Sequence, residues 1–394
     1  MTRERCPVCG ATQLEEILEL EDYPFAGNGV VLANQAKNLP YQSLRITFCH
    51  GCGMVFQSDQ MPFETYLDMR QRQPVPPPIT ESGLEKSETE RFFNQLRRYA
   101  PEGGRVLDIG CGYSGMLSRL KAIGFDVVGI DADERVTEGC EKEGYEVIAG
   151  RFDEALFDEE SFDIIVCRSV IEHVEEPLIL LGAIDGLLKP GGLMAIETPN
   201  FGQAFEKIAF GGFSPQYQTY FTLSTLRYAV TQHGHDILGG YDESYVALFT
   251  RKVDADEDPY DPMPSADVEE AFERVDSFLN RKEDIAEELS SVVRDDFNGP
   301  VAVFGAGLPT VDMFFYCDIY DNVEMVTTTD TGRHGGILGG TDFEVKSMDD
   351  LLKSGLEAVI LSSERRQDEL LDRLKPFMQD GGRVLRFTPQ ISVT

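Results

Sequence analysis

Between residues 105 and 252, short apolar runs alternate with longer segments in which apolar residues recur every three or four positions. A short continuous apolar run is typical of a strand buried on both faces, and the recurring pattern is typical of an amphipathic helix. This alternation predicts an α/β domain built on a mostly parallel sheet. The predicted strands are RVLDIG (105–110), DVVGID (126–131), YEVIAG (145–150), FDIIVCRS (162–169), GLMAIETP (192–199) and a closing strand, YVALFTRK (Tyr245–Lys252).

The same alternation returns after residue 297 and predicts a second, smaller α/β domain. Before it, Asp254–Asp267 has the polar, proline-bearing composition of a linker, and 268–296 has the pattern of one long charged helix. The proline-rich run Gln73–Thr80 marks an earlier boundary, followed by a helical pattern over 84–100. The predicted parts are therefore residues 1–72, 73–253, 254–296 and 297–394. The later strands are VAVFGAG (301–307), NVEMVTTTD (322–330), AVILSS (358–363) and RVLRFT (383–388).

Residues 1–72 contain two C-x-x-C pairs, each followed by glycine, in a segment that we expect to be rich in loops. Cys6, Cys9, Cys49 and Cys52 would supply four thiolates to one tetrahedral zinc ion, which leaves no open position and makes the site structural. Free thiols are the alternative, and the paired, glycine-flanked spacing argues against them. His50, inside the second pair, is expected to be a bystander.

Acidic residues outnumber basic ones by 69 to 35, and the formal net charge is −34. A field of this sign repels nucleic acid and anionic lipid, so neither is expected as a partner. The acidic residues are spread along the chain, which suggests a halophilic protein whose self-repulsion is screened by salt. The sequence shows no signal-peptide pattern and no apolar run near the roughly 20 residues of a membrane helix, so we expect a cytoplasmic protein.

The glycine-rich segment VLDIGCGYSG (Val106–Gly115) reads as a strand, a tight turn and the start of a helix. Gly110 and Gly112 would allow close approach of a ligand, and the helix N-terminus would offer free N–H groups. Such a turn alone fits any dinucleotide or nucleoside cofactor, so a dehydrogenase-type Rossmann domain is the alternative. Two acidic residues favour S-adenosylmethionine: Asp108 before the first glycine, and Asp131 at the end of the next strand, placed for ribose hydroxyls. Ser114, where many relatives have glycine, and Phe152 are further cofactor candidates.

The central segment resembles class I methyltransferases, which have a Rossmann-like α/β domain. The chain as a whole resembles the sugar C-methyltransferase family, whose members combine an N-terminal zinc-binding domain, a class I methyltransferase domain and a C-terminal second α/β domain. The matching segments of the central domain are Ile171–Val174, Leu187–Gly192 and Glu197–Asn200. The matching segments outside it are Pro24–Asn28, Cys52–Gln57, Phe304–Gly307, Asp330 and Ile337–Thr341.

The resemblance implies proton removal from the carbon beside a keto group of a nucleotide-linked deoxysugar, followed by attack of the enolate on the cofactor's methyl group. It also implies a second site for an anionic ligand, contributed by the C-terminal domain. Gln216 and Tyr217 stand where the family has a glutamate–histidine pair, and Leu308–Thr310 stands where it usually has a lysine. The candidates for the base are therefore His173, Tyr217, Tyr220 and Tyr66.

Two other functions remain open from the sequence. O- or N-methylation of a small metabolite needs little help from a base, because positioning supplies much of the rate. A methyltransferase-like scaffold without activity is the third possibility, and the intact Asp108, Gly110, Gly112 and Asp131 argue against it.

Overall fold

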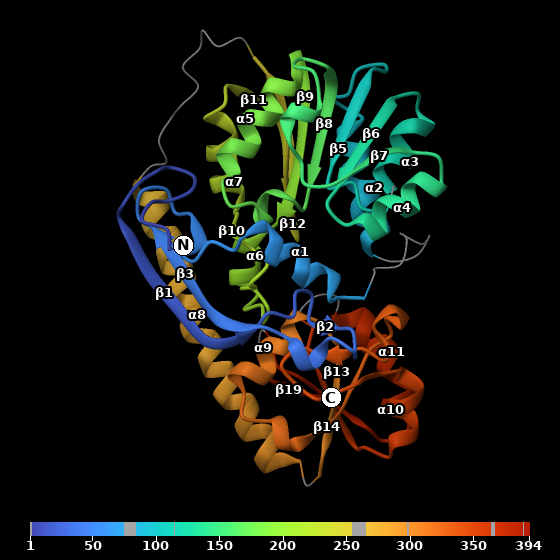
Figure 1. Ribbon diagram of the computed structural model, residues 1–394. Coiled ribbons are helices and arrows are strands. Elements are labelled where there is room, and N and C mark those ends of the chain that lie inside the picture. The colour runs from blue at the N-terminus through green and yellow to red at the C-terminus, as the bar shows by residue number, and fades with distance from the viewer. Residues whose placement is uncertain are drawn as a thin grey trace.

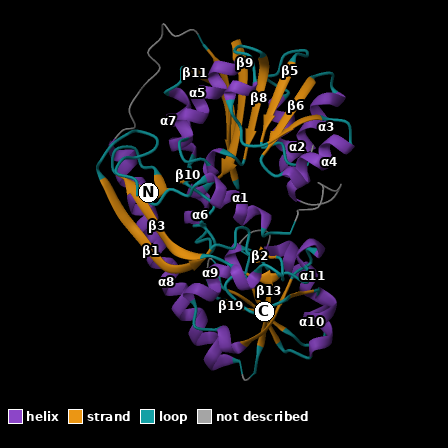
Figure 2. Ribbon diagram, viewed as in Figure 1, coloured by secondary structure: helices purple, strands orange, loops and turns teal. Residues whose placement is uncertain are grey.

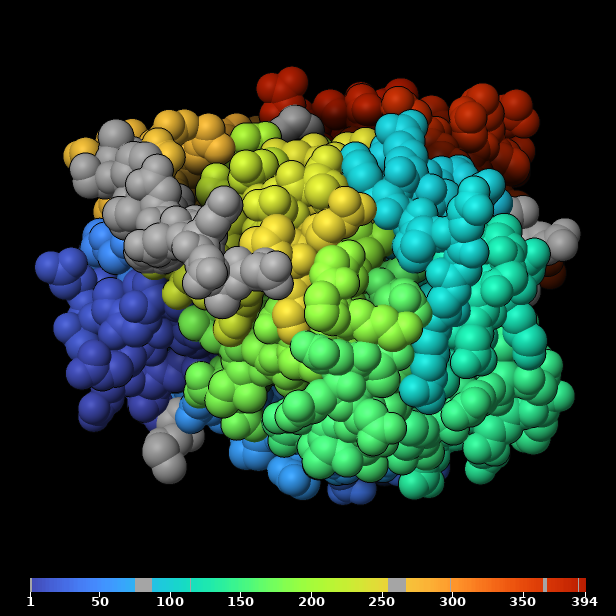
Figure 3. Space-filling model, turned by 90° about the horizontal axis from the view of Figure 1, so that it is seen from above, coloured from blue at the N-terminus to red at the C-terminus, as the bar shows by residue number. Residues whose placement is uncertain are grey.

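The computed structural model describes residues 2–74, 84–113, 115–253, 265–297, 299–363, 367–388 and 390–394. Most of the proline-rich break and of the acidic linker lies outside these residues. Figure 1 shows the central domain above a smaller C-terminal domain, with the N-terminal module and one long helix along the side of both. From above, the N-terminal module and the C-terminal domain lie on adjacent sides of the central domain (Figure 3).

The central domain has the doubly wound sheet that the sequence predicts, in the order β11-β12-β9-β8-β5-β6-β7. The strands from β5 to β9 run parallel, and β12 is antiparallel to β9. Helices cover both faces (Figure 2). The strands are β5 (Arg105–Ile109), β6 (Asp126–Asp131), β7 (Glu146–Ala149), β8 (Phe162–Arg168), β9 (Leu188–Pro199), β11 (His235–Asp242) and β12 (Tyr245–Lys252). The helices are α2 (Leu84–Leu96), α3 (Gly115–Ala122), α4 (Glu134–Lys142), α5 (Pro177–Leu187), α6 (Phe201–Glu206) and α7 (Leu223–Thr231).

The N-terminal module is not loop-rich, contrary to the expectation from its sequence. Strands β1 (Leu14–Pro24) and β3 (Tyr41–Cys49) form a long antiparallel pair, and β4 (Val55–Gln57) adds to β3. The alternation in β1 is hard to see because the strand has two register shifts, between Glu16 and Leu18 and between Leu20 and Tyr23, which interrupt it. Strand β10 (Thr219–Tyr220) of the central domain completes this sheet. The remaining elements of the module are β2 (Val30–Val31) and α1 (Phe63–Gln71).

The C-terminal domain is a second α/β unit with the strand order β16-β14-β13-β17-β18-β19. Helix α8 (Ser265–Asp296) precedes it, and β15 (Ile337–Leu338) leaves it to pair with β2 of the N-terminal module. Its strands are β13 (Val301–Phe304), β14 (Val323–Thr327), β16 (Val345–Lys346), β17 (Ala358–Leu361), β18 (Arg383–Arg386) and β19 (Ser392–Val393). Its helices are α9 (Leu308–Tyr316), α10 (Met348–Ser354) and α11 (Gln367–Gln379). In the described part of the chain, no helix is long and apolar enough to cross a membrane.

One buried carboxylate, Asp312 of α9, joins all parts of the molecule. Its Oδ2 accepts hydrogen bonds from the backbone N–H of Gly211 in the central domain and from Lys282 Nζ of α8, both at 2.6 Å. Its Oδ1 accepts from the hydroxyl of Tyr23 in β1. Lys282 and Asp312 are each only 1% exposed, and Lys282 Nζ lies 3.9 Å from the ring centroid of Tyr316. We call this group of residues the carboxylate joint. It links three bodies: the N-terminal module, the central domain, and the C-terminal domain with helix α8.

Candidate functional site

A cavity of about 560 Å³ lies at the carboxyl ends of β5, β6 and β8. The strand order reverses between β5 and β8, and ligands of open α/β sheets bind at this point. The N-terminal module forms part of the cavity wall through Asn28 and through the α1 residues Phe63, Tyr66 and Arg70. The cavity volume lies within the range of about 300–1,000 Å³ that is common for small-molecule sites.

The glycine turn after β5 presents its backbone to this cavity. Gly110 has φ +70°, its N–H donates to the carbonyl of Ile130 at 2.8 Å, and a β-carbon there would lie 2.3 Å from Val170 Cγ2. Gly112 has φ +53° with open space around the position of a β-carbon, and its N–H donates to Asp131 Oδ2 at 3.0 Å. Both positions therefore favour glycine, and the turn is held against the end of β6.

Asp131 lines the cavity at the end of β6, together with Phe152. Its Oδ1 accepts from the N–H of Asp133 at 2.9 Å, and burial raises its pKa. Asp108 lies at the end of β5 and is 2% exposed; burial raises its pKa to about 7, against the opposing effect of the Arg168 guanidinium. Asp108 is not among the residues that line the cavity, so the structure places it beneath the turn. Ser114 lies outside the described residues.

His173 ends the 3₁₀ turn Ile171–His173 after β8 and lines the same cavity. Its Nδ1 lies 2.8 Å from the carbonyl oxygen of Gln216. Because a carbonyl can only accept, Nδ1 carries the proton and Nε2 keeps its lone pair. The ring lies between Tyr66 and Tyr217, with centroids 5.0 and 5.2 Å away, and burial lowers the pKa of His173 to about 4.

The tyrosine candidates separate into two groups. Tyr66 and Tyr217 line the cavity on either side of His173, and burial raises the pKa of Tyr66 to about 12. Tyr220 is fully buried in β10 and is not part of the cavity wall. Its hydroxyl donates to the carbonyl of Ser214 at 3.0 Å and accepts from the N–H of the same residue at 3.2 Å. Tyr220 is thus placed to brace the 214–220 turn, which corrects the expectation that it faces the substrate.

Glu172 is a cavity residue that the sequence did not single out. It is 0% exposed, its Oε2 accepts from Thr198 Oγ1 at 2.9 Å, and no hydrogen-bond partner for its Oε1 is found among the described residues. That free oxygen lies 3.9 Å from His173 Nε2, and burial raises the pKa of Glu172 to about 8. A glutamate beside a histidine is an ordinary sequence pair, so only its burial and its unbonded oxygen mark it as functional.

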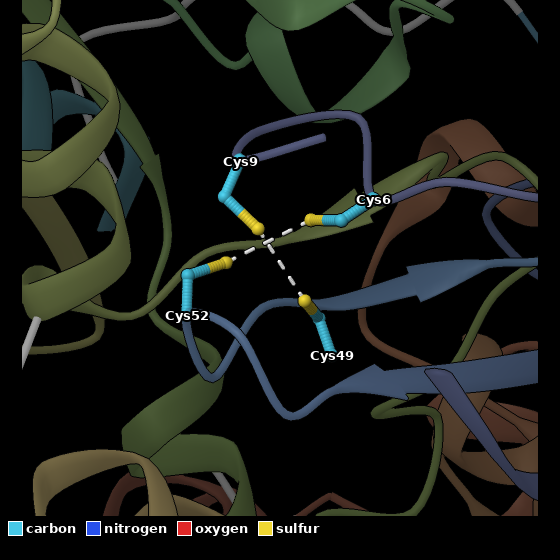
Figure 4. A group of neighbouring side chains, drawn as sticks. All are labelled: Cys6, Cys9, Cys49 and Cys52. Carbon is cyan, nitrogen blue, oxygen red and sulfur yellow. Dashed lines mark hydrogen bonds between the residues drawn. The ribbon is translucent and has the colours of Figure 1, made fainter. Parts of the chain in front are cut away.

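The four N-terminal cysteines converge on one point (Figure 4). Their sulfur atoms lie within 4.8 Å of one another, with Cys6–Cys52 at 3.7 Å and Cys9–Cys49 at 3.5 Å. Tetrahedral thiolates about 2.3 Å from zinc would be about 3.8 Å apart, so this geometry is compatible with the ion. The N–H groups of Val8 and Gly51 point at sulfurs, as in zinc knuckles. His50 bonds Glu15 at 2.8 Å and takes no part in the cluster.

The glycine turn of the C-terminal domain, Gly305–Gly307, is covered by backbone of the other two parts of the molecule. A β-carbon at Gly29 would lie 2.4 Å from the carbonyl carbon of Gly307 and 2.8 Å from Leu308 N. A β-carbon at Gly211 would lie 2.7 Å from Pro309 N. Backbone of the other two bodies therefore occupies the N-terminus of α9, where a phosphate would have to sit.

Comparison with known proteins agrees with the geometry of the central domain. Residues 84–238 match a family model described as a methyltransferase domain. A ubiquinone biosynthesis O-methyltransferase of Ruegeria pomeroyi is 43% identical over 120 residues, which are 29% of this chain and 47% of that protein. The one of Roseobacter denitrificans is 40% identical over 105 residues, 25% of this chain and 42% of that protein. The match thus spans less than half of either relative.

Among solved structures, an S-adenosylmethionine-dependent methyltransferase from Mesorhizobium loti has 18% identity and a TM-score of 0.35, covering 40% of this chain and 96% of that one. One from Archaeoglobus fulgidus has 19% identity and a TM-score of 0.34, covering 42% and 94%. The family match, with the strand order and the glycine turn, defines the central domain as a class I S-adenosylmethionine-dependent methyltransferase domain with a Rossmann-like α/β fold.

The residues present fit S-adenosylmethionine. Gly110 and Gly112 offer backbone close to the cavity, Asp131 faces it at the end of β6, and Phe152 supplies an apolar surface beside them. A carboxylate at this position accepts hydrogen bonds from ribose hydroxyls in nucleoside-binding α/β domains. The N–H donors of Gly112 and Asp133 fix the orientation of the Asp131 carboxylate, so it is preorganised for such a ligand.

Proposed function

We propose that this protein is an S-adenosylmethionine-dependent methyltransferase that methylates carbon beside a keto group in a nucleotide-linked deoxysugar. One observation supports the proposal: a single cavity is lined both by the cofactor candidates Gly110, Gly112 and Asp131 and by His173, whose Nδ1 is hydrogen-bonded and whose Nε2 accepts no hydrogen bond from the described residues. When bound, the cofactor supplies an electrophilic methyl group. The acceptor then has to lie beside His173, at the other end of the same space.

His173 is the proposed base. Burial keeps it neutral at pH 7, because its pKa is about 4. A neutral imidazole with a protonated Nδ1 can accept a proton only at Nε2. Tyr66 and Tyr217 lie on either side of the ring and line the cavity, and we propose that a tyrosine hydroxyl donates to the enolate oxygen.

Glu172 compensates for the weak basicity of the buried histidine in this proposal. Once His173 holds the substrate proton, an ionised Glu172 3.9 Å away stabilises the imidazolium ion. Because the pKa of Glu172 is about 8, its ionised fraction rises as pH increases through that value. The rate of proton abstraction should therefore rise through about pH 8, and this rise should disappear in a Glu172→Gln variant.

The proposed ligands of one structural zinc ion are Cys6, Cys9, Cys49 and Cys52. Four thiolates fill a tetrahedral zinc ion completely, so the site has no position for a substrate. The second cysteine pair leads directly into β4. This strand pairs with β10, at the end of the 214–220 turn whose residues Gln216 and Tyr217 line the cavity. The proposed ion thus supports the cavity wall from a distance.

O-methylation of a small hydroxylated metabolite is the second candidate function. The curated relatives that match the central domain are named ubiquinone biosynthesis O-methyltransferases. A catechol hydroxyl is acidic enough to react with little help from a base, and the cavity could position it.

Hydrogen exchange separates the two functions. Protein, S-adenosylhomocysteine and a nucleotide-linked keto-deoxysugar are mixed in deuterium oxide, and the sugar is analysed by mass spectrometry. Carbon methylation requires proton removal, so we expect deuterium to enter beside the keto group without methyl transfer. A positioned base contributes about 10²- to 10⁴-fold, so His173→Gln should slow exchange by at least about 100-fold.

His50→Gln is the matched control, because this variant makes the same substitution at an exposed histidine outside the cavity wall. It should exchange at close to the wild-type rate. Failure of the wild type to exchange deuterium into any keto-sugar nucleotide, together with methylation of a catechol, would reject the sugar proposal in favour of O-methylation.

A further inference from the structure

A chain of hydrogen bonds runs from the C-terminal domain to the proposed base. Arg333 Nη1 donates to the backbone carbonyl of Asn28 at 3.2 Å. The Asn28 side-chain oxygen accepts from Gln216 Nε2 at 3.1 Å, and the Gln216 carbonyl accepts from His173 Nδ1 at 2.8 Å. Arg333 belongs to the C-terminal domain, Asn28 to the N-terminal module, and Gln216 and His173 to the methyltransferase domain. All three bodies therefore contribute to the placement of one imidazole.

Arg333 is itself fixed by groups that have a different use in dinucleotide-binding domains. Its Nε donates to Asp330 Oδ2 at 2.9 Å, and its Nη1 also donates to the carbonyl of Ala306 at 2.5 Å. Ala306 lies in the glycine turn after β13, and Asp330 follows β14. In a dinucleotide site, such a turn and such an acidic residue would face pyrophosphate and ribose. Here they hold an arginine against the N-terminal module.

The Gln216 carbonyl determines which tautomer the His173 ring adopts. The flanking contacts from Tyr66 and Tyr217 restrict how the ring can turn but do not choose which nitrogen holds the proton. In neutral imidazole, the hydrogen bond of one nitrogen sets the protonation of the other. A carbonyl displaced from Nδ1 would allow the second tautomer, in which Nε2 carries the proton and cannot accept another.

We propose that Arg333 and Asn28 are positioning residues that hold the Gln216 carbonyl against His173 and so keep His173 Nε2 free for the substrate proton. The C-terminal domain thereby acts on the base from outside the methyltransferase domain. This proposal rests on the proposed function, in which His173 is the base. The tautomer itself can be measured without any methyl transfer.

The test is nuclear magnetic resonance of protein labelled with ¹⁵N-histidine and bound to S-adenosylhomocysteine. The chain has five histidines, so the His173 signals can be assigned from a His173→Gln variant. We expect the Nδ1–H tautomer in the wild type. In Arg333→Ala and in Asn28→Ala, the tautomer ratio should fall by about fivefold, which is the effect of one neutral hydrogen bond.

Two further variants make the result specific. Asn28→Asp keeps an oxygen that accepts from Gln216 Nε2, so it should retain the wild-type tautomer. Arg373→Ala removes an exposed arginine of the same domain that donates to Thr329 Oγ1 and Glu369, and it should change nothing. An unchanged ratio in both Arg333→Ala and Asn28→Ala would overturn the proposal.

Cofactor binding distinguishes this failure from failure of the proposed function. S-adenosylhomocysteine affinity is measured by calorimetry for every variant, and we expect Arg333→Ala to keep the wild-type value because Arg333 lies outside the cavity wall. A wild type that binds no cofactor rejects the proposed function. A wild type that binds it, with an unmoved His173 tautomer in the variants, rejects only the role of Arg333 and Asn28.

Discussion

Two buried carboxyl groups of this protein differ sharply in their surroundings. Asp312, in the carboxylate joint, receives hydrogen bonds from Gly211, Lys282 and Tyr23. Glu172, in the cavity wall, receives one from Thr198, and within the described part of the chain its second oxygen has no side-chain or backbone partner from another residue. Both groups are at most 1% exposed. The degree of burial alone therefore does not distinguish a structural carboxylate from a reactive one.

The difference lies in how completely each carboxylate is compensated. A buried charge with a paired cation and several donors stabilises one arrangement of its neighbours. A buried carboxyl with an unbonded oxygen costs free energy in the folded protein, and such costs are concentrated at functional sites. Asp312 thus holds the three parts of the molecule together, whereas Glu172, in the proposed function, supplies the carboxylate that stabilises protonated His173.

The largest expected effect on stability comes from a substitution of Asp312 in the carboxylate joint. Asp312→Asn removes the negative partner of Lys282 and leaves a buried cation, which should lower the free energy of unfolding by about 3–5 kcal/mol. Urea unfolding at fixed salt measures the change. Asp372→Asn is the matched control, because Asp372 pairs with Lys375 at the same 2.6 Å distance but on the surface. That variant should lose less than about 1 kcal/mol, and equal losses would contradict the comparison.

Asp131 lies between the two cases, since both of its oxygens accept backbone N–H groups while it also lines the cavity. Asp131→Ala removes a charged hydrogen-bonding group, and we expect S-adenosylmethionine affinity to fall by about 10- to 100-fold. Isothermal titration calorimetry measures the affinity. Asp153→Ala, which changes an exposed carboxylate next to Phe152, should bind normally. Similar losses in both variants would show that Asp131 has no specific part in binding.

Glu172→Gln should have the smallest effect on stability, and with the opposite sign to Asp312→Asn. The pKa of Glu172 is raised from 4.5 to about 8 in the folded protein, so the folded state binds the extra proton. Its contribution to stability is therefore lost as pH rises from about 4.5 through about 8. Glutamine cannot ionise, so the variant should be more stable than wild type at pH 8.5, by roughly 1–3 kcal/mol.

Unfolding curves of Glu172→Gln measured between pH 5 and pH 9 give this difference directly. Glu154→Gln, which changes an exposed residue at the cavity rim, should follow the wild-type curve at every pH. A Glu172→Gln curve parallel to the wild type would show that Glu172 is compensated after all.

The central sheet and the cysteine cluster could be predicted from the sequence for a physical reason. Buried parallel strands leave continuous apolar runs, and zinc knuckles need closely spaced cysteine pairs, so both are local signals. The strand from Leu14 to Pro24 was missed because two register shifts in its pairing with β3 interrupt its alternation. The sequence likewise does not show that Gly29 covers the turn at Gly305–Gly307.

The site was less predictable than the fold. His173 and Asp131 stand at the ends of recognisable strands, whereas the parts played by Glu172, Asn28 and Arg333 depend on contacts between distant segments. Gln216 is more than 180 residues away from Asn28 in the chain, yet the two side chains are hydrogen-bonded. No local sequence pattern indicates such a pairing. Tyr220 was a candidate base because the sequence does not show that its hydroxyl is bonded to Ser214.

The pairing of β10 with β4 limits how this molecule can be divided. A fragment that ended before residue 219 would leave the edge of β4 without the two residues that now cover it. Exposed strand edges recruit further strands, so such a fragment should self-associate through β4. An N-terminal module that is isolated, or exchanged between proteins, therefore has to include the 214–220 turn. Nearly 150 residues of chain separate this turn from the end of the module.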